Sequence, residues 1–536
     1  MQQEQTNLDK LGDISAKLSL GRTSLGLSVI AVCTKFFGFA EKLVIAHSLG
    51  ASGAADIYFA SMGIVLSIVS LSRELIYPSL LPVFTDCLSK SAYISDGLFR
   101  KIFGLTAVLL FIIALVLAIF PEFIAGVFVA GFPQQKKQMT SVLLRELTPG
   151  LFFLGLSAVT YTALNAQRKF FKAAWPEAAL KLFILVGLAF LLPFMGIRAI
   201  AVVIGLGALG YLVIQLYFTP QHKTLFKYKR DSASKEHFRK ILLLMGPLVI
   251  GTVFSHINGL VDNLLASTLP DGSLSCLGYS KKIIDAILLI GPTALVTVVY
   301  SQLSHLKAAE DYEKFRVLIV KTFRLLLYLG LSITFLLIGL KYPLIKLLFE
   351  RGRFNIEATF GTSQALAIYA LGFVTLSLET LLVYSFFAIS NTKTPVQIGI
   401  LCVCLDIALA ITLLRPLGYL GIAAALVISK TIKVVILAFK LNKKIRGLFD
   451  SGLIYLIAKL IVTTAVSWTT LKLLLEIDNP ASFFYTAFFD LIMPAAGSLS
   501  IFILCSYLLK IEELKEIMSL LKYRKAAINR LYGEER

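Results

Sequence analysis

The chain has 536 residues, of which 57% are hydrophobic and 16% are charged, and its mean hydropathy is +0.81. An ordinary soluble domain carries about 25% charged residues, and a soluble protein could not cover this much apolar surface. The composition therefore excludes a soluble globular protein and predicts a polytopic membrane protein. The formal net charge of +20 does not indicate nucleic-acid binding, because most Lys and Arg lie in short loops between apolar segments and no nucleic-acid-binding motif occurs.

Fourteen apolar segments approach the length of about 20 residues that a helix needs to cross a bilayer. In chain order they are expected near residues 24–48, 55–84, 102–130, 142–165, 174–195, 198–218, 241–268, 278–303, 322–340, 362–390, 396–414, 418–438, 453–474 and 484–509. The fold class is therefore all-α, with about fourteen transmembrane helices. Residues 1–23 are polar and mixed in charge, unlike a signal peptide, and we expect a short cytoplasmic lead.

The distribution of basic residues predicts the topology. With both termini placed in the cytoplasm, the cytoplasmic segments hold 32 Lys and Arg residues and the opposite loops hold 10. This bias supports an even number of spans with both ends cytoplasmic, because basic loops stay on the inner side of the membrane.

The basic loop 220–240 divides the chain into six apolar segments before it and eight after it. Weak similarity links the two halves: residues 43–63 are similar to 260–282, and residues 162–176 to 386–397. We therefore expect two related six-helix lobes, with a substrate site at their interface. The two lobes would be residues 24–219 and 241–440. The last two helices, which have no counterpart in the first half, would be 452–509, and the basic C-terminal tail would be 510–536. The tail either lies on the inner leaflet as an amphipathic helix or simply ends the protein.

Charged residues inside the apolar segments are the main functional signal. A charge at the bilayer centre costs at least about 2.5–3.5 kcal/mol, so such residues should face a water-filled cavity or a partner. The candidate cationic site comprises Lys35, Lys42, Arg73, Lys281 and Lys282. The candidate supporting acids are Glu41, Asp56, Glu74, Asp262 and Asp285. Either these residues line a shared cavity, or they form internal ion pairs that hold the halves together.

A surplus of Lys and Arg favours an anionic cargo, and phosphate groups are the obvious candidate. Other charges have simpler interpretations: Lys430 near a helix end would be a snorkelling anchor, and Glu177 and Lys181, four residues apart, could pair. His256 could contact a proton or ion path or belong to a packing cluster. The sequence contains no ATP-binding loop and no catalytic or metal-binding motif in a credible context, so we expect neither an enzyme nor a cofactor.

Four stretches carry a resemblance to a known family. They are residues 34–60, 163–177, 260–291 and 347–400, in matching order over nearly the whole chain. The sequence resembles the MviN/MurJ group of lipid II flippases, within the multidrug/oligosaccharidyl-lipid/polysaccharide exporter superfamily. The resemblance implies two six-helix lobes in a V shape around a cationic cavity, and a groove from the last two helices for a polyprenyl tail. It also implies alternating access in the bacterial inner membrane, driven by the membrane potential or an ion gradient.

The resemblance can be followed residue by residue in the first lobe. Lys35 stands where the family has an arginine. A second family arginine falls on Glu41, and the neighbouring Lys42 replaces an acid, so the pair looks swapped. The double arginine of the second span falls near the neutral Val69 and Ser70.

Arg73 lies one turn beyond that position, and Lys281, Lys282 and Asp285 take the place of an Asp-Arg…Glu pattern. The implied function is translocation of lipid II, an undecaprenyl-pyrophosphate-linked precursor, by a protein that acts as a monomer among membrane lipids. The alternatives are export of another undecaprenyl-linked saccharide, multidrug antiport, and a membrane scaffold or enzyme.

Overall fold

Helices make up almost all of the computed structural model. The structure describes residues 2–90, 92–221, 233–445, 447, 449–476 and 488–519, and these contain no strand. The predicted all-α class is confirmed. Parts of the basic loop (222–232) and of the C-terminal tail (520–536) lie outside the described residues, so the predictions made for them stay predictions.

Eleven helices of the described chain are long and apolar enough to cross a membrane, and thirteen spans result if each of two bent helix pairs counts as one. The predicted segment 24–48 would be the fourteenth. It lies in α1 (Gln2–Leu49), which also contains the predicted lead. Three charged residues, Lys35, Glu41 and Lys42, lower the hydropathy of this helix, so the fourteenth span stays a prediction.

Prolines set two boundaries that hydropathy did not predict. The expected segment 102–130 is wrong at its end: α3 (Ala92–Ile119) stops before Pro121, and a separate short helix, α4 (Pro121–Phe128), follows. Proline has no N–H for the preceding turn, so it favours the first turn of a new helix. Similarly, α9 (Ser273–Leu288) continues into α10 (Ala294–Ala308) through a π-helical turn, η2 (Leu289–Thr293), that contains Pro292.

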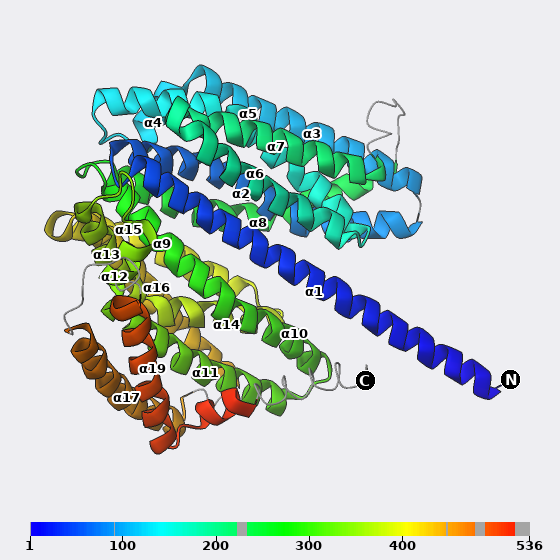
Figure 1. Cartoon of the computed structure of the whole chain (residues 1–536). Coiled ribbons are helices and arrows are strands. Elements are labelled where there is room, and N and C mark those ends of the chain that lie inside the picture. Colours follow the sequence, from blue (N-terminus) through cyan, green and yellow to red (C-terminus); the bar gives the residue numbers. More distant parts are fainter. Residues whose placement is uncertain are drawn as a thin grey trace, which may run out of the picture. The chain divides into compact units, whose positions relative to one another are not determined.

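The first compact unit, called unit 1, comprises residues 1–275. Its further helices are α2 (Gly53–Lys90), α5 (Gln134–Ala166), α6 (Phe170–Met195), α7 (Arg198–Phe218) and α8 (Ala233–Ala266). Helix α2 packs against α5 and α8, α5 also packs against α3 and α7, and α1 packs against α6 (Figure 1). A core that includes Leu80, Phe84 and Phe99 joins α2 to α3. The charged residues of α1, α2 and α6 are thus held on one packed scaffold.

The second compact unit, called unit 2, comprises residues 276–536. It holds α11 (Tyr312–Gly339), α12 (Lys341–Phe349), α13 (Ile356–Leu371), α14 (Phe373–Ala388), α15 (Lys393–Leu417), α16 (Tyr419–Ile445), α17 (Ser451–Leu475), the π-helical turn η3 (Phe488–Ile492) and α19 (Met493–Leu508). The two helices without a counterpart in the first half, α17 and α19, lie side by side, and α17 packs against α11 (Figure 1). Tyr328 and Phe335 of α11 share a core with Phe502 of α19.

The two compact units differ from the two predicted lobes. Helix α8, which would open the second lobe, packs against α2 and belongs to unit 1. The lobe boundaries rest on sequence repeats and not on contacts, so they stay predictions.

Candidate functional site

Arg73 of α2 forms a two-pronged ion pair with Glu177 of α6. The Nη1 and Nη2 atoms of Arg73 lie 3.4 and 3.2 Å from the two carboxylate oxygens. The Arg73 side chain is nonetheless 42% exposed and that of Glu177 is 32% exposed. Charges inside a membrane span are expected to face water or an opposite charge. Arg73 and Glu177 do both, because they pair with each other and both side chains remain partly exposed.

Two tyrosines adjoin this pair. The Arg73 guanidinium lies 4.2 Å from the ring centroid of Tyr161 in α5. Tyr77 is one helical turn after Arg73, and its ring centroid lies 5.8 Å from that of Tyr161, with the planes tilted by 47°. Both tyrosines are partly exposed. A charged pair and two aromatic rings therefore adjoin one another in unit 1.

A second charged cluster in unit 1 is buried. Lys42 donates to the Glu41 carboxylate at 2.6 Å and to the Tyr58 hydroxyl, and Lys181 of α6 lies 3.3 Å from the other Glu41 oxygen. Glu177 and Lys181 thus pair with residues of other helices rather than with each other. Because the Lys42 side chain is buried, its predicted contact with a cargo is not favoured. Lys35, two turns earlier on α1, is exposed.

The third cluster lies where α2 and α5 begin. Lys136 of α5 lies 2.9 Å from the buried Asp56 carboxylate and 2.8 Å from Asp271, in the loop after α8. Asp56 also accepts the backbone N–H groups of Gly272 and Ser275, both at 2.8 Å. Gly272 has φ +92°, a backbone conformation that favours glycine. Lys136 and Asp271 were not predicted, because they appeared to be ordinary loop residues.

The remaining predicted acids of unit 1 lie on α2 and α8. His256 Nε2 of α8 lies 3.5 Å from the Glu74 carboxylate of α2. Asp262 is half-buried in α8 and has interactions of its own. These contacts fit the packing-cluster interpretation of His256, and its role in an ion path stays a prediction.

In unit 2 the predicted residues lie in the third and fourth turns of α9. Lys281, Lys282 and Asp285 are exposed, and Lys282 Nζ lies 3.6 Å from Asp285. The acid thus balances part of the local positive charge. The sequence places these residues together because they share one short stretch of helix.

Sequence reasoning missed a second cluster in unit 2. Glu379 Oε1 of α14 accepts from Lys430 at 3.0 Å and from Lys433 at 2.6 Å, both in α16. Lys430 therefore has a partner on a neighbouring helix, which the snorkelling interpretation did not foresee. The predicted spans contained all three residues, but hydropathy carries no information about which helix faces which.

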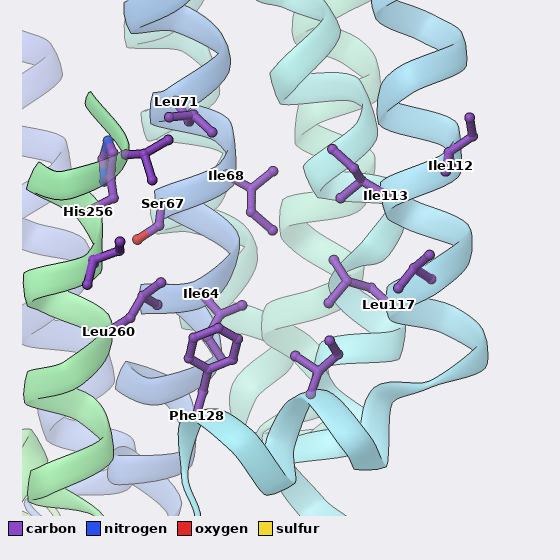
Figure 2. A pocket seen from close by; sticks show the side chains of 14 residues that line it. Ile64, Ser67, Ile68, Leu71, Ile112, Ile113, Leu117, Phe128, His256 and Leu260 are labelled. Carbon is purple, nitrogen blue, oxygen red and sulfur yellow. The ribbon is translucent and has the colours of Figure 1, made fainter. Parts of the chain in front are cut away.

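An apolar cavity of about 320 Å³ lies in unit 1 between α2, α3, α4 and α8. Figure 2 shows His256 and Leu260 on the α8 side of this space, Ser67 and Ile68 on α2, and Ile113 on the α3 side. Of the described residues that line it, none is a lysine or arginine. An anionic head group would find no counter-charge here, so the cavity is not a candidate cargo site. Across the described chain, no group of three His, Cys, Asp or Glu residues could hold a metal ion.

Residues 45–492 match the family described as lipid II flippase MurJ. The chain is 26% identical over 441 residues to the probable lipid II flippase MurJ of Buchnera aphidicola (subsp. Schizaphis graminum), covering 80% of this chain and 84% of that protein. It is 27% identical over 503 residues to the probable lipid II flippase MurJ of Thermotoga maritima, covering 93% of this chain and 98% of that protein.

Two solved structures support the same fold. A lipid II flippase MurJ in an inward closed conformation matches with a TM-score of 0.75 at 23% identity, covering 90% of this chain and 98% of that chain. An inward-facing multidrug resistance MATE family transporter of the MOP superfamily matches with a TM-score of 0.66 at 15% identity, covering 77% of this chain and 95% of that chain. At these identities the likeness shows the fold alone.

Proposed function

This chain belongs to the MurJ family of lipid II flippases, and from that premise we propose that it moves lipid II from the cytoplasmic to the outer leaflet of the bacterial inner membrane. The cargo is an undecaprenyl-pyrophosphate-linked peptidoglycan precursor, so its head group carries negative charge next to a long apolar tail. Moving such a lipid breaks no covalent bond, and the chain acts as a transporter and not as an enzyme.

The observation that carries this proposal is the exposure of basic side chains within membrane helices. Lys35 of α1 and Arg73 of α2 both keep accessible surface in helices of unit 1, and Lys281 and Lys282 are exposed in α9 of unit 2. An ammonium binds phosphate as a point charge, which suits Lys35, Lys281 and Lys282. The Arg73 guanidinium is paired with Glu177 and contributes less of this attraction. The nearby acids Glu74 and Asp285 limit the net attraction, which lets the cargo leave.

The lipid tail requires an apolar surface. In unit 2, Ile454, Ile461 and Leu473 are exposed on α17, and we assign this helix and α19 to the polyprenyl tail. Translocation proceeds by alternating access, driven by the membrane potential or an ion gradient, in a monomer with both termini in the cytoplasm.

Complementation tests the proposal. A bacterium depleted of its own lipid II flippase would express this chain or the variants Lys35→Ala, Arg73→Ala and Lys282→Ala. Lys346→Ala serves as the matched control, because Lys346 is an exposed lysine of the short helix α12 outside the candidate site. We expect growth with the parent chain and the control, and loss of growth with the three variants at equal protein levels.

Failure of the well-expressed parent chain to restore growth would overturn lipid II as the cargo and favour another undecaprenyl-linked saccharide. Growth of all three variants at the parent rate would overturn the role of these basic side chains in cargo binding while leaving the cargo unchanged.

A further inference from the structure

Within the proposed function, we propose that Arg73, Tyr77, Tyr161 and Glu177 form a saccharide-binding patch, which binds the sugar part of the cargo rather than its pyrophosphate. The four residues, called the sugar patch, come from α2, α5 and α6 of unit 1. The inference rests on the proposed function, because it names which part of the cargo this group contacts.

The charge of Arg73 is already compensated. Glu177 accepts from both terminal nitrogens of the guanidinium, at 3.4 and 3.2 Å, in the two-pronged arrangement that arginine shares with a carboxylate or a phosphate. A pyrophosphate would have to replace Glu177 or lie next to its negative charge. A neutral ligand meets no such obstacle, so the pair suits hydroxyl groups better than phosphates.

The pair retains capacity for further hydrogen bonds. Only one N–H of each terminal nitrogen is needed for Glu177, which leaves other guanidinium N–H donors and other carboxylate lone pairs. A sugar hydroxyl both donates and accepts, and neighbouring hydroxyls on a pyranose ring could bond to the arginine and the carboxylate together. The exposure of Arg73 and Glu177 leaves room for this contact.

The aromatic rings supply the complementary apolar surface. Tyr161 lies against the Arg73 guanidinium, and the tilted ring of Tyr77 adjoins it. Small-molecule sites typically combine aromatic walls with a few placed polar groups, and the C–H face of a pyranose is apolar while its edge is polar.

The test compares two lipids that differ only in the sugar-peptide head group. Purified full-length protein in detergent would be titrated with lipid II and with undecaprenyl pyrophosphate, and the Kd of each measured. We expect Tyr161→Leu to weaken lipid II binding about tenfold, as for the loss of one good aromatic contact, with the Kd for undecaprenyl pyrophosphate unchanged. Tyr161→Phe, which keeps the ring, should retain binding.

Two variants provide the comparison. Lys35→Gln should weaken the binding of both lipids, since it acts on the shared pyrophosphate. Tyr217→Leu, at an exposed tyrosine of α7 outside the patch, should change neither. If Tyr161→Leu does not fold, as judged by its melting temperature, Tyr77→Leu takes its place with the same expected selectivity.

Equal losses for the two lipids in a folded patch variant, or no loss for either, would overturn the sugar patch while leaving the proposed function standing. A parent chain that binds neither lipid would overturn the proposed function, and the sugar patch with it.

Discussion

The carboxylate of Asp56, in the first turn of α2, accepts the backbone N–H of Ser275 in the first turn of α9 at 2.8 Å. This bond satisfies a helix N-terminal N–H group that has no partner within its own helix. The same carboxylate holds Lys136, which also contacts Asp271. Asp56 is thus both a helix cap and one half of a buried ion pair.

We expect Asp56→Asn to lower the free energy of unfolding by about 2–3 kcal/mol, because it leaves Lys136 with only the more exposed Asp271. Thermal or denaturant unfolding in detergent measures this. Asp271→Asn is the matched control. It should lower the free energy of unfolding by less, since the Asp271 side chain is 65% exposed. Equal losses in the two variants would show that burial of Asp56 does not set the strength of the pair.

The buried cluster around Glu41 gives a second prediction. Lys42→Met should destabilise the protein by about 3 kcal/mol or more, because the buried Glu41 carboxylate then keeps the partly exposed Lys181 as its counter-charge and only a hydroxyl contact from Tyr58 beside it. Adding Glu41→Gln should recover much of this loss, since the buried charge is then removed and Lys181, which loses its partner, is partly exposed. A double-mutant cycle by unfolding in detergent measures the coupling, and additive losses would contradict it.

Hydropathy was sufficient to predict which segments are helices. A bilayer-spanning segment must satisfy its backbone hydrogen bonds internally, so long apolar runs have few alternatives to a helix. The errors occur where a local residue intervenes, as at Pro121, which ends α3 before the apolar run ends. The charges in α1 lower its hydropathy, so the span expected at 24–48 stays a prediction.

The candidate site was less predictable. The sequence identified Arg73 and Asp56 as unusual, but it did not identify their partners Glu177 and Lys136, which lie 104 and 80 residues away. Hydropathy gives the depth of a residue in the membrane but not the rotation of its helix or the identity of the neighbouring helix. Lys281, Lys282 and Asp285 were recognisable as a group because they share one helix.

Asp450 gives a prediction of pH dependence. It caps α17 through the backbone N–H of Leu453 and accepts two hydrogen bonds from Arg324, at 2.8 and 2.7 Å. Burial alone would raise the pKa of this carboxyl, but the bonds from Arg324 and from the backbone outweigh burial and hold the pKa below its usual range. The folded protein therefore favours the ionised form.

Stability from this group is present above the pKa of the unfolded chain, about 3.9, and disappears as the pH falls through the lower folded pKa. Asparagine caps helices as well as aspartate does, so Asp450→Asn removes mainly the charge. At pH 7 we expect Asp450→Asn to lower the free energy of unfolding by less than about 1 kcal/mol, because water screens the attraction between exposed charges. Melting temperatures of the parent and variant should converge as the pH falls, and a constant difference would contradict the prediction.

The Glu379 cluster gives the last prediction. Lys430 and Lys433 both donate to one oxygen of Glu379, so removing its charge leaves two neighbouring ammonium groups without this counter-ion. We expect Glu379→Gln to destabilise unit 2 by about 3 kcal/mol or more, measured by unfolding in detergent.

Lys433 is 14% exposed and Lys430 is 30% exposed, so adding Lys433→Met should restore more stability than adding Lys430→Met. If both additions restore it equally, repulsion between the two ammonium groups outweighs the burial of either one. If neither does, Glu379 stabilises α14 and α16 through packing rather than through its charge.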